Sequence, residues 1–282
     1  MVSLLLSPGL PRRILPFAVF LTAFTVVMTI LFLSFDLKAP KHRELFNFTR
    51  DLDFSSVGQD NPQFIAYVRA VHLQSPPNSV RVVEKFNINH QTLLVASILN
   101  NKVNGTFVEA GAYGHGKLSN TEWLESALGW HGLLIQADPW DFITLRRQKR
   151  SRASSVHACL SPTAYPKEIT FRQISASDGG DDGLSNFTRV KCFPLYSLLL
   201  AAKMTEVDYL SLDADGAEVE VLKTLPLEHV DINIISVEKK VNKSDLMNFM
   251  TVHHYELIYE LSDVYIFKMN RQELLSSPRA SV

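Results

Sequence analysis

The chain has 282 residues, with 28 Lys and Arg, 29 Asp and Glu, and a formal net charge of −1. This length allows one domain of ordinary size plus short appendages. The balanced charge excludes the strongly basic field that nucleic-acid-binding proteins use, so we expect no nucleic-acid partner. Hydrophobic residues make up 46% of the chain, and part of them is concentrated near its beginning.

Residues 14–35 form an uncharged apolar run. As a helix, 22 residues would span about 33 Å, enough for the hydrocarbon core of a bilayer. The run is longer than the apolar region of a cleavable signal peptide, and the sequence SFDLKAP at its end is a poor cleavage site. We therefore predict one transmembrane signal anchor over residues 14–35, preceded by a short cytosolic tail over residues 1–13.

Basic residues lie on both sides of this run, so their distribution does not decide the orientation. Sequons for N-glycosylation begin at Asn47, Asn104, Asn186 and Asn242. We predict glycosylation at Asn47, Asn186 and Asn242, and a C-terminal part in the lumen of the secretory pathway. The expected location is the endoplasmic reticulum and the Golgi apparatus, with the endosome or the plasma membrane as further destinations.

Two cysteines, Cys159 and Cys192, are present. An oxidising lumen would allow them to form a disulfide, and two buried thiols are the alternative. The nine His residues show none of the spacings typical of metal sites, so we predict no metal.

After a charged stalk over residues 36–60, apolar periodicity and turn residues predict an alternation of helices and strands. Helices are expected at 62–71, 90–99, 121–128, 140–149, 195–203, 217–224 and 244–253. Strands are expected at 106–109, 132–135, 155–160, 168–174, 207–212, 232–237, 255–261 and 264–268. The Gly- and Asp-rich stretch 175–186 is predicted to be a mobile loop.

Alternating strands and helices are typical of a mostly parallel sheet covered by helices on both faces. The last two predicted strands follow each other closely and form an antiparallel hairpin. We therefore predict one α/β domain over residues 61–270, followed by a polar tail over residues 271–282.

Ligands of such sheets bind outside the carboxyl ends of the strands, so the residues at three strand ends are candidates for a site. The first is the run from Glu109 through Gly111 and Tyr113 to Gly116, where glycines allow a ligand to approach the backbone. The second holds Gln136 and Asp138, at the position that contacts ribose hydroxyls in nucleotide-binding domains.

The third strand end holds Asp213, Asp215 and Glu218. Asp213 is placed to project from the end of a central strand, whereas Asp215 and Glu218 suit the first turn of the next helix. A purely structural role for these acids, as helix caps, is the alternative. Glu238 ends the following strand and is a further candidate.

The segments FVEAGAY…LSNT (residues 107–121), LGWHGLLIQADP (128–139) and VDYLSLDADGAEVEVLK (207–223) resemble the FkbM-type methyltransferase family. They are similar in particular to its membrane-anchored Star-like branch. The resemblance implies a Rossmann-like domain that binds S-adenosylmethionine and transfers its methyl group to an oxygen. It places Glu109 and Gly111 beside the methionine part of the cofactor.

The same resemblance places Asp213 and Glu218 beside the site of methyl transfer. From their positions at the strand ends, Tyr113, Gln136 and Asp138 are further candidates for the cofactor site, and Glu238 is a further catalytic candidate. Two positions depart from the family pattern. Gly114-His115-Gly116 stands where the family has an acidic-Gly-Glu run, and Gln136 replaces the acid that binds ribose. Each lost charge-assisted hydrogen bond weakens binding by about 1.5–3 kcal/mol.

Two functions follow from these observations. The Star-like resemblance implies a non-catalytic protein that binds cargo in the lumen and assists vesicle transport from the endoplasmic reticulum to the Golgi apparatus. The alternative is an active, membrane-anchored S-adenosylmethionine-dependent O-methyltransferase, with Asp213, His115 or Glu238 as the base that accepts the proton.

Overall fold

The computed structural model describes residues 20–30, 56–77, 88–173 and 186–272. The chain divides into two units, Met1–Leu52 and Asp53–Val282. In the first unit, residues 20–30 are helical and exposed, and the rest of the predicted anchor at 14–35 lies outside the described residues. Across the four described ranges, no helix combines the length and the apolar character that crossing a membrane requires. The predicted N-terminal tail, residues 273–282 of the predicted C-terminal tail, residues 175–185 of the predicted loop at 175–186, and Asn47 also fall outside these ranges.

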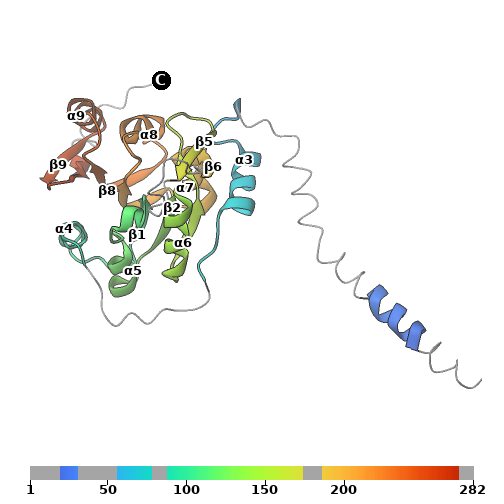
Figure 1. The fold of residues 1–282 in the computed structure, drawn as a ribbon. Coiled ribbons are helices and arrows are strands. Elements are labelled where there is room, and N and C mark those ends of the chain that lie inside the picture. The colour runs from blue at the N-terminus through green and yellow to red at the C-terminus, as the bar shows by residue number, and fades with distance from the viewer. Residues whose placement is uncertain (1–19, 31–55, 78–87, 174–185, 273–282) are drawn as a thin grey trace, which may run out of the picture. The chain divides into compact units, whose positions relative to one another are not determined.

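The second unit is built on a seven-stranded sheet with the order β3-β2-β1-β7-β8-β10-β9 (Figure 1). Its first five strands in this order are parallel, and β10 pairs antiparallel with both β8 and β9. The strands are β1 (Thr106–Ala110), β2 (His131–Gln136), β3 (Ala153–His157), β7 (Glu206–Leu212), β8 (Asp231–Glu238), β9 (Tyr255–Glu260) and β10 (Val264–Met269). The predicted α/β fold with a mostly parallel sheet and a closing antiparallel hairpin is therefore confirmed.

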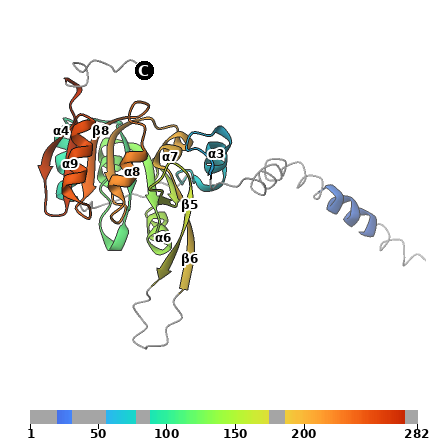
Figure 2. The same ribbon diagram turned by 90° about the horizontal axis from the view of Figure 1, so that it is seen from above.

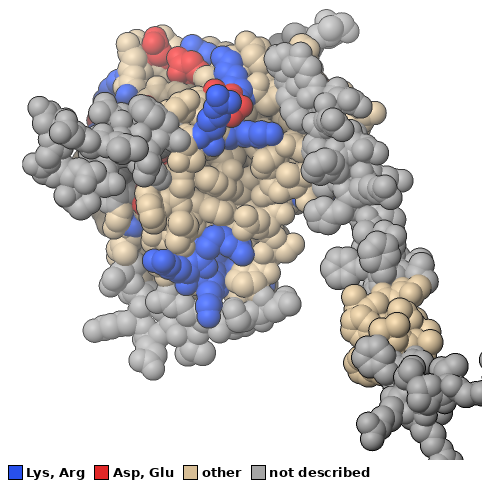
Figure 3. Space-filling model, turned by 45° about the vertical axis from the view of Figure 1, so that its right-hand side comes forward, with Lys and Arg blue, Asp and Glu red and all other residues tan. Residues whose placement is uncertain are grey.

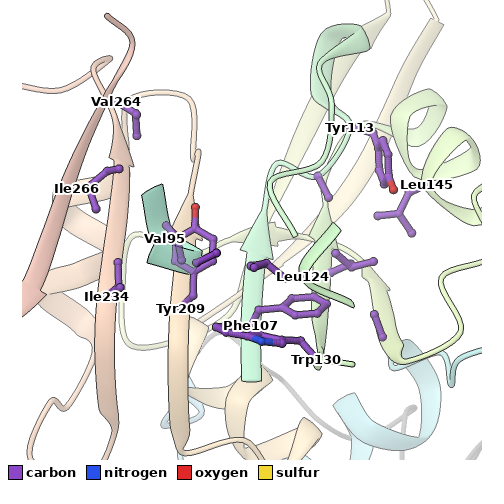
Figure 4. Packing of buried hydrophobic residues seen from close by; sticks show 14 of the residues in the cluster. Val95, Phe107, Tyr113, Leu124, Trp130, Leu145, Tyr209, Ile234, Val264 and Ile266 are labelled. Atoms are coloured by element: carbon purple, nitrogen blue, oxygen red, sulfur yellow. The ribbon is translucent and has the colours of Figure 1, made fainter. Parts of the chain in front are cut away.

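Helices cover both faces of this sheet because its central strands are apolar on both sides. On one face α4 (His90–Ile98), α5 (Glu122–Leu128) and α6 (Pro139–Arg147) contribute Val95, Leu124 and Leu145 to a single buried cluster (Figure 4). The strands contribute Phe107 and Tyr209 to the same cluster.

On the other face, seen in front in Figure 2, α7 (Leu195–Ala202), α8 (Glu218–Thr224) and α9 (Lys243–Val252) pack side by side. The helix α3 (Pro62–Tyr67), which continues as the π-helix η2 (Val68–His72), lies against α7. Asn61 begins α3 by accepting hydrogen bonds from two backbone N–H groups, as an N-cap does.

A second sheet of three strands was not expected from the sequence. Its order is β4-β6-β5, formed by β4 (Cys159–Leu160), β5 (Lys167–Gln173) and β6 (Asn186–Phe193). The single strand predicted at 155–160 is wrong in this respect, because the chain leaves the main sheet after His157 and β4 joins the small sheet. β6 lies partly in the stretch predicted as a loop, and it pairs antiparallel with β5 along its whole length.

The two cysteines form a disulfide that joins β4 to β6, where Cys159 and Cys192 are partners in the parallel register. Of the two alternatives left open by the sequence, the structure therefore has the disulfide. Cys192 is buried, and the bond fastens β4 to β6 within the small sheet.

We expect the double substitution Cys159→Ser and Cys192→Ser to lower the free energy of unfolding of the full chain in detergent by about 3–4 kcal/mol. The reason is that the bond closes a loop with a sequence separation of 33 and so restricts the unfolded chain. Urea unfolding followed by circular dichroism measures this difference. An unfolding midpoint that is unchanged in the variant, and unchanged in the original chain after reduction, would contradict the expectation.

Candidate active site

The candidate site lies at the carboxyl edge of the main sheet, where the strand order reverses between β1 and β7. Gly111 follows β1 with φ +82°, a conformation that other residues rarely adopt. A Cβ atom on Gly111 would lie 2.9 Å from the Cβ of Asp213, so only glycine lets the turns after β1 and β7 come this close. The predicted importance of the glycine thus has a packing reason.

Two cavities open at this edge. One of about 330 Å³ extends over the ends of β1 and β2 and is lined by Gln136, Asp138 and the disulfide. The other, of about 420 Å³, extends over β7 and β8 and is lined by Glu109, Lys117 and Glu238 among others. Ala110, Gly111 and Asp213 line both cavities and so form the partition between them.

Glu109 is 2% exposed, and its carboxylate is fully engaged with the segment that follows the first turn. It accepts hydrogen bonds from the Ser119 hydroxyl at 2.7 Å, the Asn120 N–H at 2.8 Å and the Thr121 hydroxyl at 2.5 Å. These bonds compensate the cost of burying a charge. The residue therefore fixes the course of the chain between β1 and α5.

Arg150 provides the positive charge of this buried network. Its Nε donates to Glu125 Oε2 at 2.7 Å, and its other nitrogens donate to the Tyr113 phenol and to the hydroxyls of Ser119 and Thr121. Both side chains of the Arg150–Glu125 pair are 4% exposed. Tyr113, at φ +61°, is thereby turned into the network, and burial raises the pKa of its phenol so that it stays neutral.

Gln136 is buried, and both ends of its amide are engaged with the backbone. Its Nε2 donates to the carbonyl oxygen of Ala112 at 2.7 Å, and its Oε1 accepts from the N–H of Asp138 at 2.9 Å. Asp138 in turn caps α6 by accepting from the N–H groups of Trp140 and Asp141. The two residues predicted to contact ribose therefore bridge the turns after β1 and β2.

Asp213 and Glu238 lie in a cluster with two lysines. Lys240 Nζ lies 3.0 Å from Asp213 Oδ1 and 2.7 Å from Asp215 Oδ1, and Lys117 Nζ lies 2.5 Å from Glu238 Oε1 and 3.7 Å from Asp213 Oδ2. Burial raises the pKa of Glu238, and the hydrogen bond from Lys117 opposes this effect. Asp213 and Glu238 thus lie in one cluster, as expected, but a lysine ammonium group contacts each of the two carboxylates.

Glu218 occupies a different place. It is fully buried, and its Oε1 accepts hydrogen bonds from the N–H groups of Ala214 at 2.9 Å and Gly216 at 3.2 Å. It does not line either cavity. Its hydrogen bonds stabilise the turn after β7, which agrees with the structural role that the sequence analysis gave as the alternative. The catalytic role of Glu218 stays a prediction. The side chain of His115 lies outside the part of the chain that the structure describes.

Sequence reasoning missed Arg150, Lys117 and Lys240. Arg150 belongs to a run of basic residues that the sequence analysis interpreted only as the end of a helix. Nothing in the sequence of that run distinguishes the one arginine whose side chain is buried. Lys117 contacts an acid 121 residues away, and Lys240 contacts one 27 residues away. Such contacts become visible only once the strand order is known.

We expect Arg150→Met to lower the free energy of unfolding by about 3–5 kcal/mol, because it leaves the buried carboxylate of Glu125 without its cation. The matched control is Arg147→Met, which removes an exposed cation three residues away and should change stability by at most about 0.5 kcal/mol. Urea unfolding of the two full-length variants tests the difference. Equal losses in both would refute a structural role for the buried network.

Comparison with known proteins agrees with this architecture. Residues 77–265 match the model of the methyltransferase FkbM domain. No curated protein matches the chain significantly.

Among solved structures, the chain is similar to a protein in the NADB-Rossmann superfamily from Streptococcus agalactiae, with 10% identity, a TM-score of 0.42 and coverage of 66% of this chain and 70% of the other. It is also similar to precorrin-6y C5,15-methyltransferase from Geobacter metallireducens GS-15, with 12% identity, a TM-score of 0.36 and coverage of 68% and 94%. These structural similarities are too low to carry an argument about function. The match to the family model, however, covers more than half of the chain, and the chain therefore belongs to the methyltransferase FkbM domain family.

Proposed function

We propose that this chain is a single-pass membrane protein of the secretory pathway whose lumenal methyltransferase-fold domain binds protein cargo and does not transfer methyl groups. In this proposal residues 14–35 anchor the protein, residues 1–13 lie in the cytosol, and the domain assists vesicle transport from the endoplasmic reticulum to the Golgi apparatus. The resemblance to Star-like proteins suggests this role, and the geometry of the site supports its non-catalytic part.

The observation that carries the proposal is the pair of ammonium groups that contact Asp213, a residue that lines both cavities. S-adenosylmethionine carries its methyl group on a positively charged sulfonium, and transfer from one cavity to the other would bring that charge to Asp213. Lys240 and Lys117 already lie 3.0 Å and 3.7 Å from its two carboxylate oxygens. The carboxylate of Asp213 therefore already has two cationic partners, and a sulfonium would have to displace them, at a cost of about 1–4 kcal/mol for each like charge 4 Å away.

The ribose position argues in the same direction. A cofactor ribose needs a side chain that accepts hydrogen bonds from its two hydroxyl groups. Gln136 Oε1 already accepts from the N–H of Asp138, and Asp138 Oδ1 already accepts from the start of α6. Gln136 therefore offers ribose a neutral amide whose groups already bond to the backbone, in place of the acid of the family pattern, and the residues present fit the cofactor less well than that pattern does.

Two further observations support the proposed compartment. The disulfide between Cys159 and Cys192 is typical of proteins that mature in an oxidising compartment. The sequon residue Asn242 is exposed at the start of α9, and its Oδ1 caps the helix by accepting from the N–H groups of Ser244 and Asp245. The side chain of Asn186, at the start of β6, lies outside what the structure describes.

A second candidate function is methyl transfer by an anchored enzyme that uses S-adenosylmethionine. It is favoured by two adjoining cavities that share Asp213, and by the burial that raises the pKa of Glu238 toward the range of a general base. In this case Glu238 would face the acceptor and Lys117 would hold it in place.

Calorimetry of the full chain in lipid nanodiscs separates the two functions. We expect no binding of S-adenosylmethionine below millimolar concentration. Binding at micromolar concentration by the unaltered chain would overturn the non-catalytic proposal and favour the second candidate.

The matched variant for this experiment is Gly114→Asp with Gln136→Glu, which restores acids where the family pattern has them. A Cβ on Gly114 would lie 3.8 Å from Gln136 Nε2, an ordinary contact distance, so the new side chain has room there. Gln136→Glu removes the donor to the carbonyl oxygen of Ala112, so the new carboxylate must turn away from that oxygen. Each new charge-assisted hydrogen bond strengthens binding by about 1.5–3 kcal/mol, so we expect a gain of at least about tenfold. The thermal unfolding midpoint of the variant serves as the control for folding.

Glycosidase treatment tests the compartment. When the full chain is expressed in insect or mammalian cells, we expect peptide-N-glycosidase to increase its electrophoretic mobility, and Asn242→Gln to remove one step of that increase. Unchanged mobility, together with digestion of the domain by protease added to intact microsomes, would place the domain on the cytosolic side and contradict the proposal.

A further inference from the structure

Helix α6 exposes an unusual set of side chains to solvent. Trp140 is 64% exposed and Ile143 is 40% exposed, although large apolar side chains are normally buried. The opposite side of the helix is firmly attached to the domain, because Phe142 and Leu145 belong to the buried cluster. The exposed side is therefore held on a rigid support.

Exposed cations follow this apolar pair along the chain, on the last turn of α6 and in the residues just after it. Arg146, Arg147, Lys149 and Arg152 are exposed, and the sequence contains no Asp or Glu from residue 142 to residue 167. Within the described part of the chain, none of these four forms a salt bridge with an acidic side chain. Figure 3 shows a group of Lys and Arg side chains low on the domain with no acidic side chain beside it.

The apolar and the basic side chains share one stripe of the helix. Trp140, Ile143 and Arg147 stand at positions i, i+3 and i+7, which lie on one face because a helix turns about 100° per residue. Arg146 borders this face, and its Nη1 is steadied by a hydrogen bond to the Ser155 hydroxyl. We call Trp140, Ile143, Arg146, Arg147, Lys149 and Arg152 the α6 surface.

This composition is that of a protein-binding surface. Trp and Arg are the residues most enriched among those that dominate the energy of protein interfaces. Exposed cations without acidic partners attract a negatively charged ligand and select against a positive one. The helix needs no rearrangement to present them, so little ordering is required on binding.

We propose that the α6 surface binds an acidic segment of a partner protein, in which one or more apolar side chains pack against Trp140 and Ile143 while carboxylates pair with the four cations. The inference rests on the proposed function as a partner-binding protein and assigns the surface that does the binding. It favours a protein over a lipid surface, because the anionic lipids that attract basic helices lie mainly in the cytosolic leaflet, away from a lumenal domain.

Two fluorescent peptides of twelve residues provide the probe. Both carry six Glu or Asp residues, and the remaining positions are Leu and Phe in the first and Ser in the second. Their binding to the full chain in nanodiscs of neutral lipid is measured by fluorescence anisotropy at two salt concentrations. We expect the first peptide to bind at least about tenfold more tightly than the second, and both to bind more weakly at high salt.

Variants identify the contributions of the two parts of the surface. Trp140→Ser should remove the preference for the apolar peptide, whereas Arg147→Glu with Lys149→Glu should weaken both peptides by at least about tenfold. The matched control is Lys223→Glu with Lys268→Glu, which makes the same change in charge at exposed positions on α8 and β10. This control should bind both peptides as the unaltered chain does.

Three outcomes would overturn the inference. Equal affinity for the two peptides would show a nonspecific basic patch. Loss of binding in the control variant but not in the α6 variants would place the peptide elsewhere and leave a partner-binding role intact. Binding of phosphatidylserine vesicles that depends on Arg147 and Lys149, with no peptide binding, would assign the surface to lipid. The peptide and vesicle measurements contain no S-adenosylmethionine. Their failure is therefore distinguishable from a failure of the proposed function, which is tested by cofactor binding and by glycosidase treatment.

Discussion

The guanidinium of Arg150 is buried in the centre of this domain, and a buried charge is stable only when each of its donors has a partner. Glu125 supplies the opposite charge, and Tyr113, Ser119 and Thr121 accept the remaining hydrogen bonds. Because these acceptors come from the turn after β1 and from the start of α5, the requirement fixes the course of the chain between them.

The shape of the candidate site depends on this constraint. The segment that Arg150 and Glu109 hold in place brings Lys117 to the carboxyl edge of the sheet, within 2.5 Å of Glu238. Lys240, which follows β8, places its Nζ 3.0 Å from Oδ1 of Asp213. Polar groups that a nucleotide cofactor would use are thereby engaged with groups of the chain itself, and this arrangement is the basis of the proposed non-catalytic role.

Most of the fold was predictable from the sequence because the parallel strands are apolar runs that alternate with amphipathic helices. β6 was missed although Val190 and Cys192 are buried and Arg189 and Lys191 are not, a period-two pattern that the preceding turn-rich stretch obscured. The split between β3 and β4 could not be predicted, since the alternation of buried and half-buried residues continues through His157, Ala158 and Cys159 without a break.

The site was predictable in part. Glycine and acidic residues at strand ends indicated its location, and Gly111, Gln136 and Asp213 do line the cavities there. Their hydrogen-bond partners could not be foreseen, since they depend on contacts between turns after different strands. Whether Gln136 faces a ligand or the carbonyl oxygen of Ala112 is a matter of side-chain direction, which strand position alone does not decide.

The central claim is that the ammonium groups at the partition between the cavities exclude a cationic methyl donor. Its most direct test compares the affinities of S-adenosylmethionine and of S-adenosylhomocysteine, which has a neutral thioether in place of the sulfonium, for the chain carrying Lys117→Gln and Lys240→Gln. Our account predicts that this variant gains affinity for the cationic donor by about tenfold or more, with a smaller gain for the neutral product. An equal gain for both, or none for the donor, would contradict it.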